Sequence, residues 1–260
     1  MPELPDVETF RRYLDATALH QRLADIRVRS RRLLTGVSAR RLQQALRGRR
    51  FEATDRHGKY VFAHTDGEAM LVLHFGMTGY LEYEKDRRPG AHDRVLFDFD
   101  NGYTLAYVCQ RLLGKVVLTK SVADFVDTNH VGPDALGVGH DEFAAILAGS
   151  RAAVKSCLMN QGLIAGIGNI YSDEILFHSR LAPTRKSGAL SAREVGQLYR
   201  WMRRVLNTAV ERQADPTRMP SSWLLPHRDE GGPCPRCGGK IQRTKVGGRS
   251  AFWCPACQRR

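Results

Sequence analysis

The chain opens with MPELPDVE, residues Met1–Glu8, and the remaining sequence can be interpreted from this stretch outward. A small second residue permits removal of the initiator methionine, which predicts Pro2 as the mature N-terminus. An α-amino group has a pKa of about 8, so part of it is uncharged at neutral pH. An uncharged amine can attack C1′ of a sugar and form a Schiff base, while the Glu3 carboxyl beside it can move protons. The residues alone leave a simpler alternative open, in which Pro2 and Pro5 only start a helix.

The charge balance narrows the class of partner. The 260 residues include 40 Lys and Arg against 27 Asp and Glu, a formal net charge of +13 at pH 7. Such a surface attracts polyanions, although charge alone does not exclude a basic protein with another role. No apolar run has the length of a membrane span, and the acidic N-terminus does not fit a signal peptide. We therefore expect a cytoplasmic protein, nucleoid-associated if the source is prokaryotic, with no membrane partner.

The first half of the chain is β-rich. Residues 5–17 predict an amphipathic helix, because Val7, Phe10 and Leu14 share one face. Short strands are predicted after it, at residues 26–28, 60–62, 70–75, 94–100, 103–108 and 115–118. The pair Asn101-Gly102 predicts a hairpin turn. Together these patterns predict a β-sandwich over roughly residues 1–120, with the helix leading into it.

The second half of the chain changes to helical periodicity. Helices are predicted at residues 141–148, 152–159, 172–178 and 192–212. Ser191 and Glu194 form a capping box for the last of them. Between the second and third helices lies a glycine loop, QGLIAGIGNIY, at residues 161–171. Its backbone amides, just before a helix expected to start near Tyr171, would suit a DNA phosphate. Tight packing between helices is the alternative reason for such a loop.

Four cysteines near the C-terminus predict a structural zinc site. Cys234 and Cys237 form one CxxC pair, Cys254 and Cys257 form another, and sixteen residues separate the two pairs. Two such pairs complete a tetrahedron of thiolates with no open position for catalysis. A redox or disulfide pairing is the alternative. The segment between the pairs is basic, and a turn at residues 247–248 would project Arg249 towards a phosphate or a minor groove.

Several motifs together resemble one protein family. They are MPELPDVE (1–8), HGKY (57–60), HFGMTG (74–79), HD (92–93), VGPDAL (131–136), IAGIGNIYSDEILF (164–177) and GGRSAFWCPACQ (247–258). In this order they resemble the formamidopyrimidine-DNA glycosylase and endonuclease VIII family. The resemblance implies an α+β multidomain fold: an N-terminal β-sandwich with a leading helix at 1–127, a helix–two-turns–helix domain at 128–225, and a C-terminal zinc-finger β-hairpin at 226–260. The implied partner is double-stranded DNA containing damaged bases or abasic sites, bound by a monomer.

The resemblance also implies an enzyme of base-excision repair. It would be a bifunctional DNA glycosylase and AP lyase that excises oxidised or ring-opened bases through a Pro2 Schiff base and nicks the strand by β,δ-elimination. Glu3 would act as the acid, Lys59 would contact phosphate and assist β-elimination, and Arg249 would clamp a phosphate during δ-elimination. Further DNA contacts are implied for His74, Met77, His92, Arg111, Leu113, Lys155 and Asn169. Among these, Met77 would fill the gap left by the extruded base.

The sequence departs from the family pattern at places that affect lesion choice. Asp6 stands where many members have glutamate, and CQRLLG at residues 109–114 keeps Arg111 but places Leu113 where an aromatic wedge is usual. An apolar wedge needs bulk more than aromaticity, so Leu113 can still fill the stack. The connection at residues 213–233 is shorter than the base-covering loop of members that prefer oxidised purines. We therefore expect weaker activity on 8-oxoguanine than on ring-opened or saturated bases.

Two other functions fit parts of the sequence. One is a non-catalytic module that binds abasic or distorted DNA, but intact Pro2, Glu3 and Lys59 favour an enzyme. The other is a zinc-ribbon protein that binds RNA or proteins, which leaves the N-terminal motif unexplained.

Overall fold

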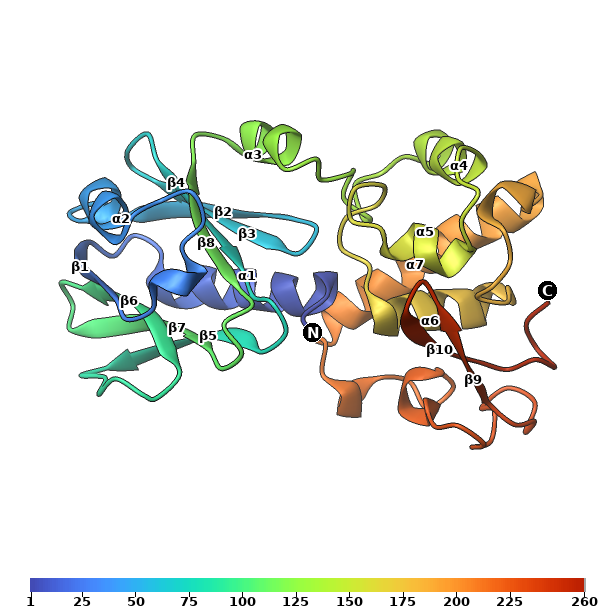
Figure 1. The fold of residues 1–260 in the computed structure, drawn as a ribbon. Coiled ribbons are helices and arrows are strands. Elements are labelled where there is room, and N and C mark those ends of the chain that lie inside the picture. The colour runs from blue at the N-terminus through green and yellow to red at the C-terminus, as the bar shows by residue number, and fades with distance from the viewer. Residues whose placement is uncertain (260) are drawn as a thin grey trace. The chain divides into compact units, whose positions relative to one another are not determined.

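The computed structural model describes residues 1–259, and Figure 1 shows its helices and strands. The chain separates into two compact units. The first contains Met1–Pro2 and Asp6–His130, and the second contains Glu3–Pro5 and the chain from Val131 onward. Helix α1 (Leu4–Ala18) therefore begins in the second unit and continues into the first. Pro2 and Glu3, which are consecutive in the sequence, belong to different units.

The first unit is a β-sandwich of two antiparallel four-stranded sheets. One sheet has the order β1-β6-β7-β5 and the other has the order β2-β3-β4-β8. Their strands are β1 (Leu23–Val28), β2 (Phe51–His57), β3 (Tyr60–Thr65), β4 (Met70–His74), β5 (Gly79–Lys85), β6 (Asp93–Phe99), β7 (Tyr103–Cys109) and β8 (Lys115–Thr119). The ring centroid of Phe51 on β2 lies 6.2 Å from that of Phe97 on β6, so the two sheets share one core. This confirms the predicted sandwich.

Helix α1 lies against the same core. Its residues Val7 and Leu14 are fully buried, and the Phe10 ring centroid lies 4.6 Å from that of Phe75. This apolar face is the one that the spacing of residues 5–17 predicted. Buried apolar area of this kind contributes roughly 25 cal/mol per Å² to folding.

The sequence missed several elements of the first unit. All six predicted strands are present, and the structure adds β2, β5, α2 (Ala39–Leu46), α3 (Val122–Thr128) and the 3-10 helix η1 (Arg31–Leu33). Strand β2 reads FEATDRH and buries only Phe51 fully, so it carries no clear alternation. Hydrogen bonding to β3, rather than its own pattern, makes it a strand.

The second unit contains the four predicted helices. They are α4 (His140–Ala148), α5 (Val154–Met159), α6 (Asn169–Ser179) and α7 (Ala192–Glu211). The capping box between Ser191 and Glu194 is formed as predicted. Helix α6 starts at Asn169, two residues before the expected start, because Glu3 binds amides of its first turn. Within the described chain, no helix has both the length and the apolar character that crossing a membrane requires.

The C-terminal hairpin also has its predicted form. Strands β9 (Gln242–Val246) and β10 (Arg249–Trp253) pair antiparallel, and Gly247 and Gly248 form the turn with φ of 56° and 75°. The connection before it is not a bare linker. It contains the 3-10 helices η3 (Pro216–Arg218) and η4 (Leu225–His227), and it buries Trp223 and Leu224. A third 3-10 helix, η2 (Ser187–Ala189), precedes α7.

Candidate active site and zinc site

The Glu3 carboxylate is held at the N-terminus of α6. It is 2% exposed and accepts hydrogen bonds from the amides of Gly168 (2.7 Å), Ile170 (2.8 Å) and Tyr171 (3.2 Å). A Cβ at position 168 would lie 2.3 Å from Cδ of Glu3, so only glycine permits this approach. The positive end of the α6 dipole adds to the attraction for a carboxylate. The GIGN loop therefore fixes one predicted catalytic group.

This arrangement corrects the expected role of the glycine loop. Its amides were expected to receive a DNA phosphate, but three of them bind Glu3. The loop is also tied to the start of α1, since the Leu4 amide donates to the Gly166 carbonyl at 2.9 Å. An amide already bonded to a buried carboxylate is not available to a phosphate. Sequence spacing could not show that a residue some 165 positions away occupies the anion site.

A second buried ionic cluster lies between α5 and α6. The Lys155 ammonium donates to Asp173 Oδ1 at 2.5 Å, and Arg228 donates to Asp173 Oδ2 at 2.8 Å. The same Asp173 oxygen, Oδ2, accepts from the Phe252 amide on β10 at 3.1 Å. Asp173 thus ties both cations and the zinc-finger hairpin to α6. A carboxylate with this many donors is costly to remove, because each cation would lose its counter-charge.

Lys155 does not lie where a phosphate contact was predicted. Its side chain is 0% exposed, and its ammonium also donates to the Asn169 carbonyl and the Ser172 hydroxyl, each at 3.2 Å. Burial lowers the pKa of Lys155 below its ordinary value, although Asp173 opposes the shift. Because all three of its donors are directed to acceptors inside the protein, the ammonium is unlike a direct phosphate contact.

Asn169 and Arg249 are the more accessible predicted residues of the second unit. Arg249 is exposed at the first position of β10, directly after the glycine turn. Asn169 is the first residue of α6, and its buried Oδ1 has no hydrogen-bond partner among residues 1–259. An unsatisfied buried oxygen costs about 1–3 kcal/mol, so a bound group that reorients this amide would relieve that cost.

In the first unit, Lys59 and His74 lie at neighbouring ends of β3 and β4. Lys59 immediately precedes Tyr60, which pairs with His74 across the sheet and places its ring centroid 4.9 Å from the imidazole. Lys59 is 6% exposed. Burial, followed by the charges of Lys115 and Lys59, lowers the pKa of His74 to about 4. A neutral imidazole is therefore present at pH 7, and its Nδ1 faces the Gly76 amide at 3.4 Å, which leaves Nε2 to carry the proton.

We expect the low pKa of His74 to appear as pH-dependent stability. In the unfolded chain the imidazole titrates near ~6.5, so the unfolded state takes up a proton first as the pH falls. The free energy of unfolding should decrease by up to about 3 kcal/mol between pH 6.5 and pH 4 through this group. Denaturant unfolding of wild type and His74→Asn across this range checks it. In His74→Asn the free energy of unfolding should no longer show this decrease with falling pH. The exposed-site control His20→Asn should still show it.

The three residues expected to enter the base stack lie together in the first unit. Met77 is 37% exposed and Leu113 is 49% exposed. A Cβ at Gly76 would lie 2.5 Å from the Leu113 backbone, so the two loops are in close contact. The Arg111 amide donates to Thr78 Oγ1 at 3.2 Å, which joins the same loops again. Exposed large apolar side chains next to an exposed cation, Arg111, fit a surface that binds a ligand.

His92 is held by a backbone hydrogen bond to Cys109, two residues before Arg111. Its carbonyl accepts from the Cys109 amide at 2.9 Å, and its ring nitrogen Nδ1 lies 3.2 Å from Nη2 of Arg94. The next residue, Asp93, is 2% exposed and is bonded by Arg87 through two oxygens at 3.0 Å. The buried ion pair thus fixes the loop that presents His92.

The N-terminus itself is open to processing. Met1 is 50% exposed and Pro2 is half-buried. Because half of the Met1 surface is exposed to solvent, its removal would uncover little buried surface.

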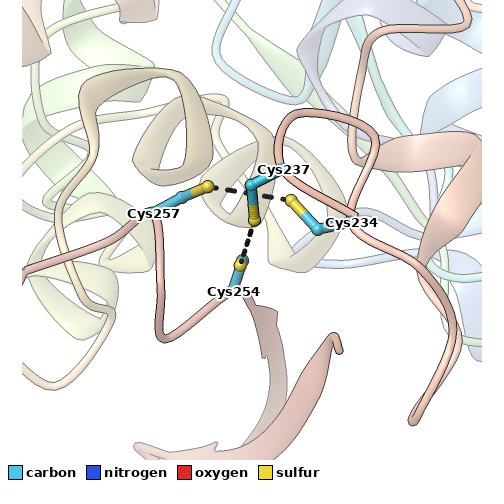
Figure 2. Close-up of side chains that lie close together, drawn as sticks. All are labelled: Cys234, Cys237, Cys254 and Cys257. Carbon is cyan, nitrogen blue, oxygen red and sulfur yellow. Dashed lines mark hydrogen bonds between the residues drawn. The ribbon is translucent and has the colours of Figure 1, made fainter. Parts of the chain in front are cut away.

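The four C-terminal cysteines form a site suited to one zinc ion (Figure 2). The sulfur atoms all lie within 4.8 Å of one another, with Cys234 3.8 Å from Cys257 and Cys237 3.6 Å from Cys254. A tetrahedron with Zn–S bonds of ~2.3 Å has edges of about 3.8 Å, which matches these separations. The pairs are far longer than the ~2.05 Å of a disulfide bond. The predicted structural zinc site is confirmed, and the disulfide alternative does not fit.

Removal of one zinc ligand is expected to unfold the finger. The apolar cluster under it contains only Phe177, Leu224, Ile241 and two of the cysteines among its buried members. Structural zinc supplies about 10–16 kcal/mol in such modules, far more than this cluster can. Cys237→Ser should therefore lose the bound zinc, with metal analysis and hairpin protection from hydrogen exchange as the measurements. The control Cys157→Ala removes a buried cysteine of α5 and should keep one zinc per chain.

Three family models match most of the chain. Residues 1–116 match the formamidopyrimidine-DNA glycosylase N-terminal domain, residues 131–221 match the formamidopyrimidine-DNA glycosylase H2TH domain, and residues 231–260 match the zinc finger found in FPG and IleRS. The chain belongs to the formamidopyrimidine-DNA glycosylase family. It is accordingly a DNA glycosylase, an enzyme of base-excision repair that acts on damaged bases in DNA. The predicted family, fold class and enzyme class are confirmed.

Individual relatives agree with this assignment. The chain is 33% identical over 279 residues to the formamidopyrimidine-DNA glycosylase of Heliobacterium modesticaldum, with 100% of each chain covered. It resembles the Lactococcus lactis Fpg in complex with DNA that contains N7-benzyl-Fapy-dG, with a TM-score of 0.90, 27% identity and full coverage of both chains. It resembles equally the complex of that protein with abasic-site DNA, at a TM-score of 0.90 and 27% identity.

Residues that position the site were missed by the sequence interpretation. Asp173 lies within the recognised IAGIGNIYSDEILF motif but was given no role. Arg228 lies in the connection that was interpreted only by its length. Nothing in sequence spacing indicates that these two form one ion pair, because 55 positions separate them.

Proposed function

We propose that this glycosylase is bifunctional and forms a Schiff base between the Pro2 amine and C1′ of the damaged nucleotide. The observation that carries the proposal is the Glu3 carboxylate, held by three amides at the N-terminus of α6. Because Pro2 is bonded to Glu3, fixing that carboxylate restricts where the amine can lie. A nucleophile and a proton-transfer group are thus kept adjacent, as covalent catalysis requires.

The proposed reaction proceeds in four bond-breaking stages. The Pro2 nitrogen attacks C1′ while the glycosidic bond breaks and the base leaves with a proton. Glu3 assists opening of the sugar ring, which leaves an iminium between Pro2 and C1′. Loss of the C2′ proton then expels the 3′ phosphate by β-elimination, and a second elimination expels the 5′ phosphate. We assign Lys59 to the first elimination and Arg249 to the second.

The remaining assigned residues bind DNA. We propose that Arg249 and Asn169 contact one phosphate and that His74 donates to another through Nε2. Met77 and Leu113 fill the space that the extruded base leaves, and Arg111 bonds the orphan base. His92 lies beside Arg111 and contacts the adjoining strand. The solved complexes of the Lactococcus lactis relative with damaged and abasic DNA support double-stranded DNA as the partner.

We propose an indirect role for Lys155. Its ammonium bonds both the Asn169 carbonyl and Asp173, and Asp173 bonds the Phe252 amide on the Arg249 hairpin. Arg249 and Asn169 together form the proposed phosphate clamp. Lys155 therefore positions this clamp through its hydrogen bonds, without contacting the phosphate. Its positive charge also adds to the field at the N-terminus of α6.

The salt dependence of DNA binding should separate these two roles. Arg249→Gln is expected to weaken binding on every duplex and to reduce the slope of log K against log salt by about one unit, because one phosphate contact is lost. Lys155→Met should leave that slope close to wild type but lower the free energy of unfolding, since Asp173 loses a buried partner. A full unit lost from the slope in Lys155→Met would restore the direct-contact role.

The proposed substrates are ring-opened or saturated bases and abasic sites. The short connection buries Trp223 and Leu224, and its amides at Leu224 and Leu225 are bonded by Glu174. A segment held down in this way has less chain with which to cover an extruded base. Discrimination then depends on how easily the lesion unstacks, and 8-oxoguanine stacks well.

Single-turnover excision on matched duplexes tests this substrate class. Formamidopyrimidine and an oxidised pyrimidine should be excised faster than 8-oxoguanine opposite cytosine. The reverse order would show that the pocket contacts the purine directly.

Borohydride trapping on abasic DNA tests the enzyme against the alternative of a non-catalytic binder. A covalent adduct supports the enzyme, and binding without an adduct supports the alternative.

The division of the chain into three domains at 1–127, 128–225 and 226–260 remains part of the proposal, as do a monomeric state and a cytoplasmic or nucleoid location. Limited proteolysis tests the boundaries. Cleavage is expected near residues 127–131, where the two compact units meet along the sequence.

A further inference from the structure

A cavity of about 530 Å³ lies in the second unit at the C-terminal end of α6. Four arginines line it: Arg180, Arg193, Arg236 and Arg259. Among the described residues that line it, Glu194 is the one acidic residue. Asn169 lies at the other end of α6, eleven residues from Arg180 and so roughly 16 Å away at 1.5 Å per residue. The cavity is thus separate from the proposed phosphate clamp.

The fold brings these arginines together from four segments. Arg180 follows α6 in the left-handed conformation with φ of 58°, and Arg193 lies in the first turn of α7. Arg236 lies between the first two cysteines of the zinc site. Arg259 is placed by backbone pairing, since its amide donates to the Arg180 carbonyl at 2.9 Å and its carbonyl accepts from Ala182 at 2.8 Å. No local sequence pattern contains this cluster.

The charges around the cavity are not balanced. Arg236 donates to the Phe177 carbonyl at 2.9 Å and stacks on that ring. Within residues 1–259, the guanidinium groups of Arg180, Arg193 and Arg259 have no hydrogen-bond or ion-pair partner. The Glu194 carboxylate is already bonded to Arg185 and Ser191. Like charges that converge on one cavity repel each other, and a bound anion would relieve that repulsion.

The lining also limits what kind of anion fits. The Trp201 ring is stacked on His178, with 4.5 Å between the ring centroids, and Cζ of Arg204 lies 5.0 Å from the Trp201 ring centroid. Neighbouring side chains therefore already pack against this ring. Recognition by stacking of a base is therefore less favoured than recognition by charge. Guanidinium groups match phosphate oxygens with paired hydrogen bonds. A concave site of this volume suits a compact ligand better than the backbone of a duplex.

We propose that this cavity binds a small oligophosphate, either an inorganic tripolyphosphate or the triphosphate group of a nucleotide. The inference does not depend on the chemistry proposed for Pro2. Binding would link α6, α7 and the zinc finger through one anion. It should therefore stabilise the second unit as the ligand concentration rises above the dissociation constant.

Calorimetric titration with tripolyphosphate at fixed ionic strength, without DNA, tests the proposal. The double variant Arg180→Gln/Arg193→Gln should bind at least tenfold more weakly than wild type. The matched control Arg40→Gln/Arg41→Gln removes the same charge from exposed positions of α2 and should bind as wild type does. Equal weakening in both variants would overturn the proposal, because the effect would then be one of net charge. Absence of tripolyphosphate binding by wild type would overturn it directly.

Further arms identify the source of the phosphate. Equal affinity for tripolyphosphate and a nucleoside triphosphate would show that the phosphates alone are recognised, and tighter binding of the nucleotide would show an added nucleoside contact. Both support the site. If the double variant instead loses salt-dependent affinity for undamaged duplex while tripolyphosphate binding persists, the arginines contact DNA and the proposal fails. Borohydride trapping on abasic DNA should be unchanged in the Arg180→Gln/Arg193→Gln variant. If this double variant does not fold, Arg259→Gln provides a second test of the cavity.

Discussion

Keeping Met1 attached to Pro2 is expected to abolish covalent trapping on abasic DNA. The attack on C1′ needs a nitrogen lone pair, and an acylated Pro2 nitrogen is an amide without nucleophilic character. Protein with Met1 removed, verified by intact mass, should give a borohydride-stable adduct. Protein that retains an N-terminal extension should give less than about a thousandth of that adduct, because a nucleophilic route is removed rather than weakened.

The comparison needs a control for binding. Met1 is half exposed, so its retention should leave the fold and the affinity for abasic duplex nearly unchanged. Pro2→Gly in trimmed protein keeps a free amine but loses the rigid ring, and its adduct should be strongly reduced. Undiminished trapping by the extended protein would overturn the assignment of Pro2 and point to a lysine as the nucleophile.

Glu3→Gln is expected to reduce base excision by about 10²–10⁴-fold, the range that positioned proton transfer contributes. A glutamine at this position would still reach the N-terminus of α6, but it cannot exchange a proton with the sugar. Its side-chain NH2 group would face backbone amides that also donate hydrogen bonds. At least one of the three hydrogen bonds that Glu3 accepts would therefore be lost. Single-turnover excision with a ring-opened base is the measurement.

A matched variant separates chemistry from structure. Glu174 is also on α6, is 0% exposed, and accepts from the amides of Leu224 and Leu225 at 3.0 and 2.7 Å. Glu174→Gln should lower stability by an amount similar to Glu3→Gln, yet retain excision close to wild type. On preformed abasic DNA, where no base has to leave, Glu3→Gln should lose less activity than on a base lesion. An equal loss of excision in both variants would make Glu3 a structural residue only.

Local patterns predicted the elements that depend on neighbours in sequence. Four predicted features formed as expected: the helix at residues 5–17, the Asn101-Gly102 hairpin, the Ser191 capping box and the glycine turn before Arg249. The zinc ligands were equally readable, because a CxxC pair directs two thiolates to one centre wherever the chain places it. Strand β2, which escaped prediction, has a weak pattern of its own and is formed by pairing with β3.

Burial and long-range pairing were not readable from sequence. Lys155 had the residue type and motif position of a phosphate contact, but its ammonium lies 2.5 Å from Asp173 inside the second unit. The glycine loop had the composition of a phosphate cradle, but its amides bind Glu3. A formal charge or a free amide in a sequence has no partner until the fold assigns one, and in these two places the fold assigned an internal one.

By itself, therefore, the sequence determined which groups this protein carries: a proline at position 2, a carboxyl beside it, four cysteines spaced for zinc, and an excess of cations. Those properties are local and additive, so residue type and spacing suffice to read them. Only the tertiary structure decided which of those cations remain open to a ligand. Lys155 is neutralised inside the protein by a carboxylate 18 positions away. Arg180, Arg193 and Arg259 instead line one cavity, and no carboxylate among residues 1–259 pairs with them. Electrostatic attraction depends on distance and burial, and neither is set until helices and loops far apart in the chain pack together.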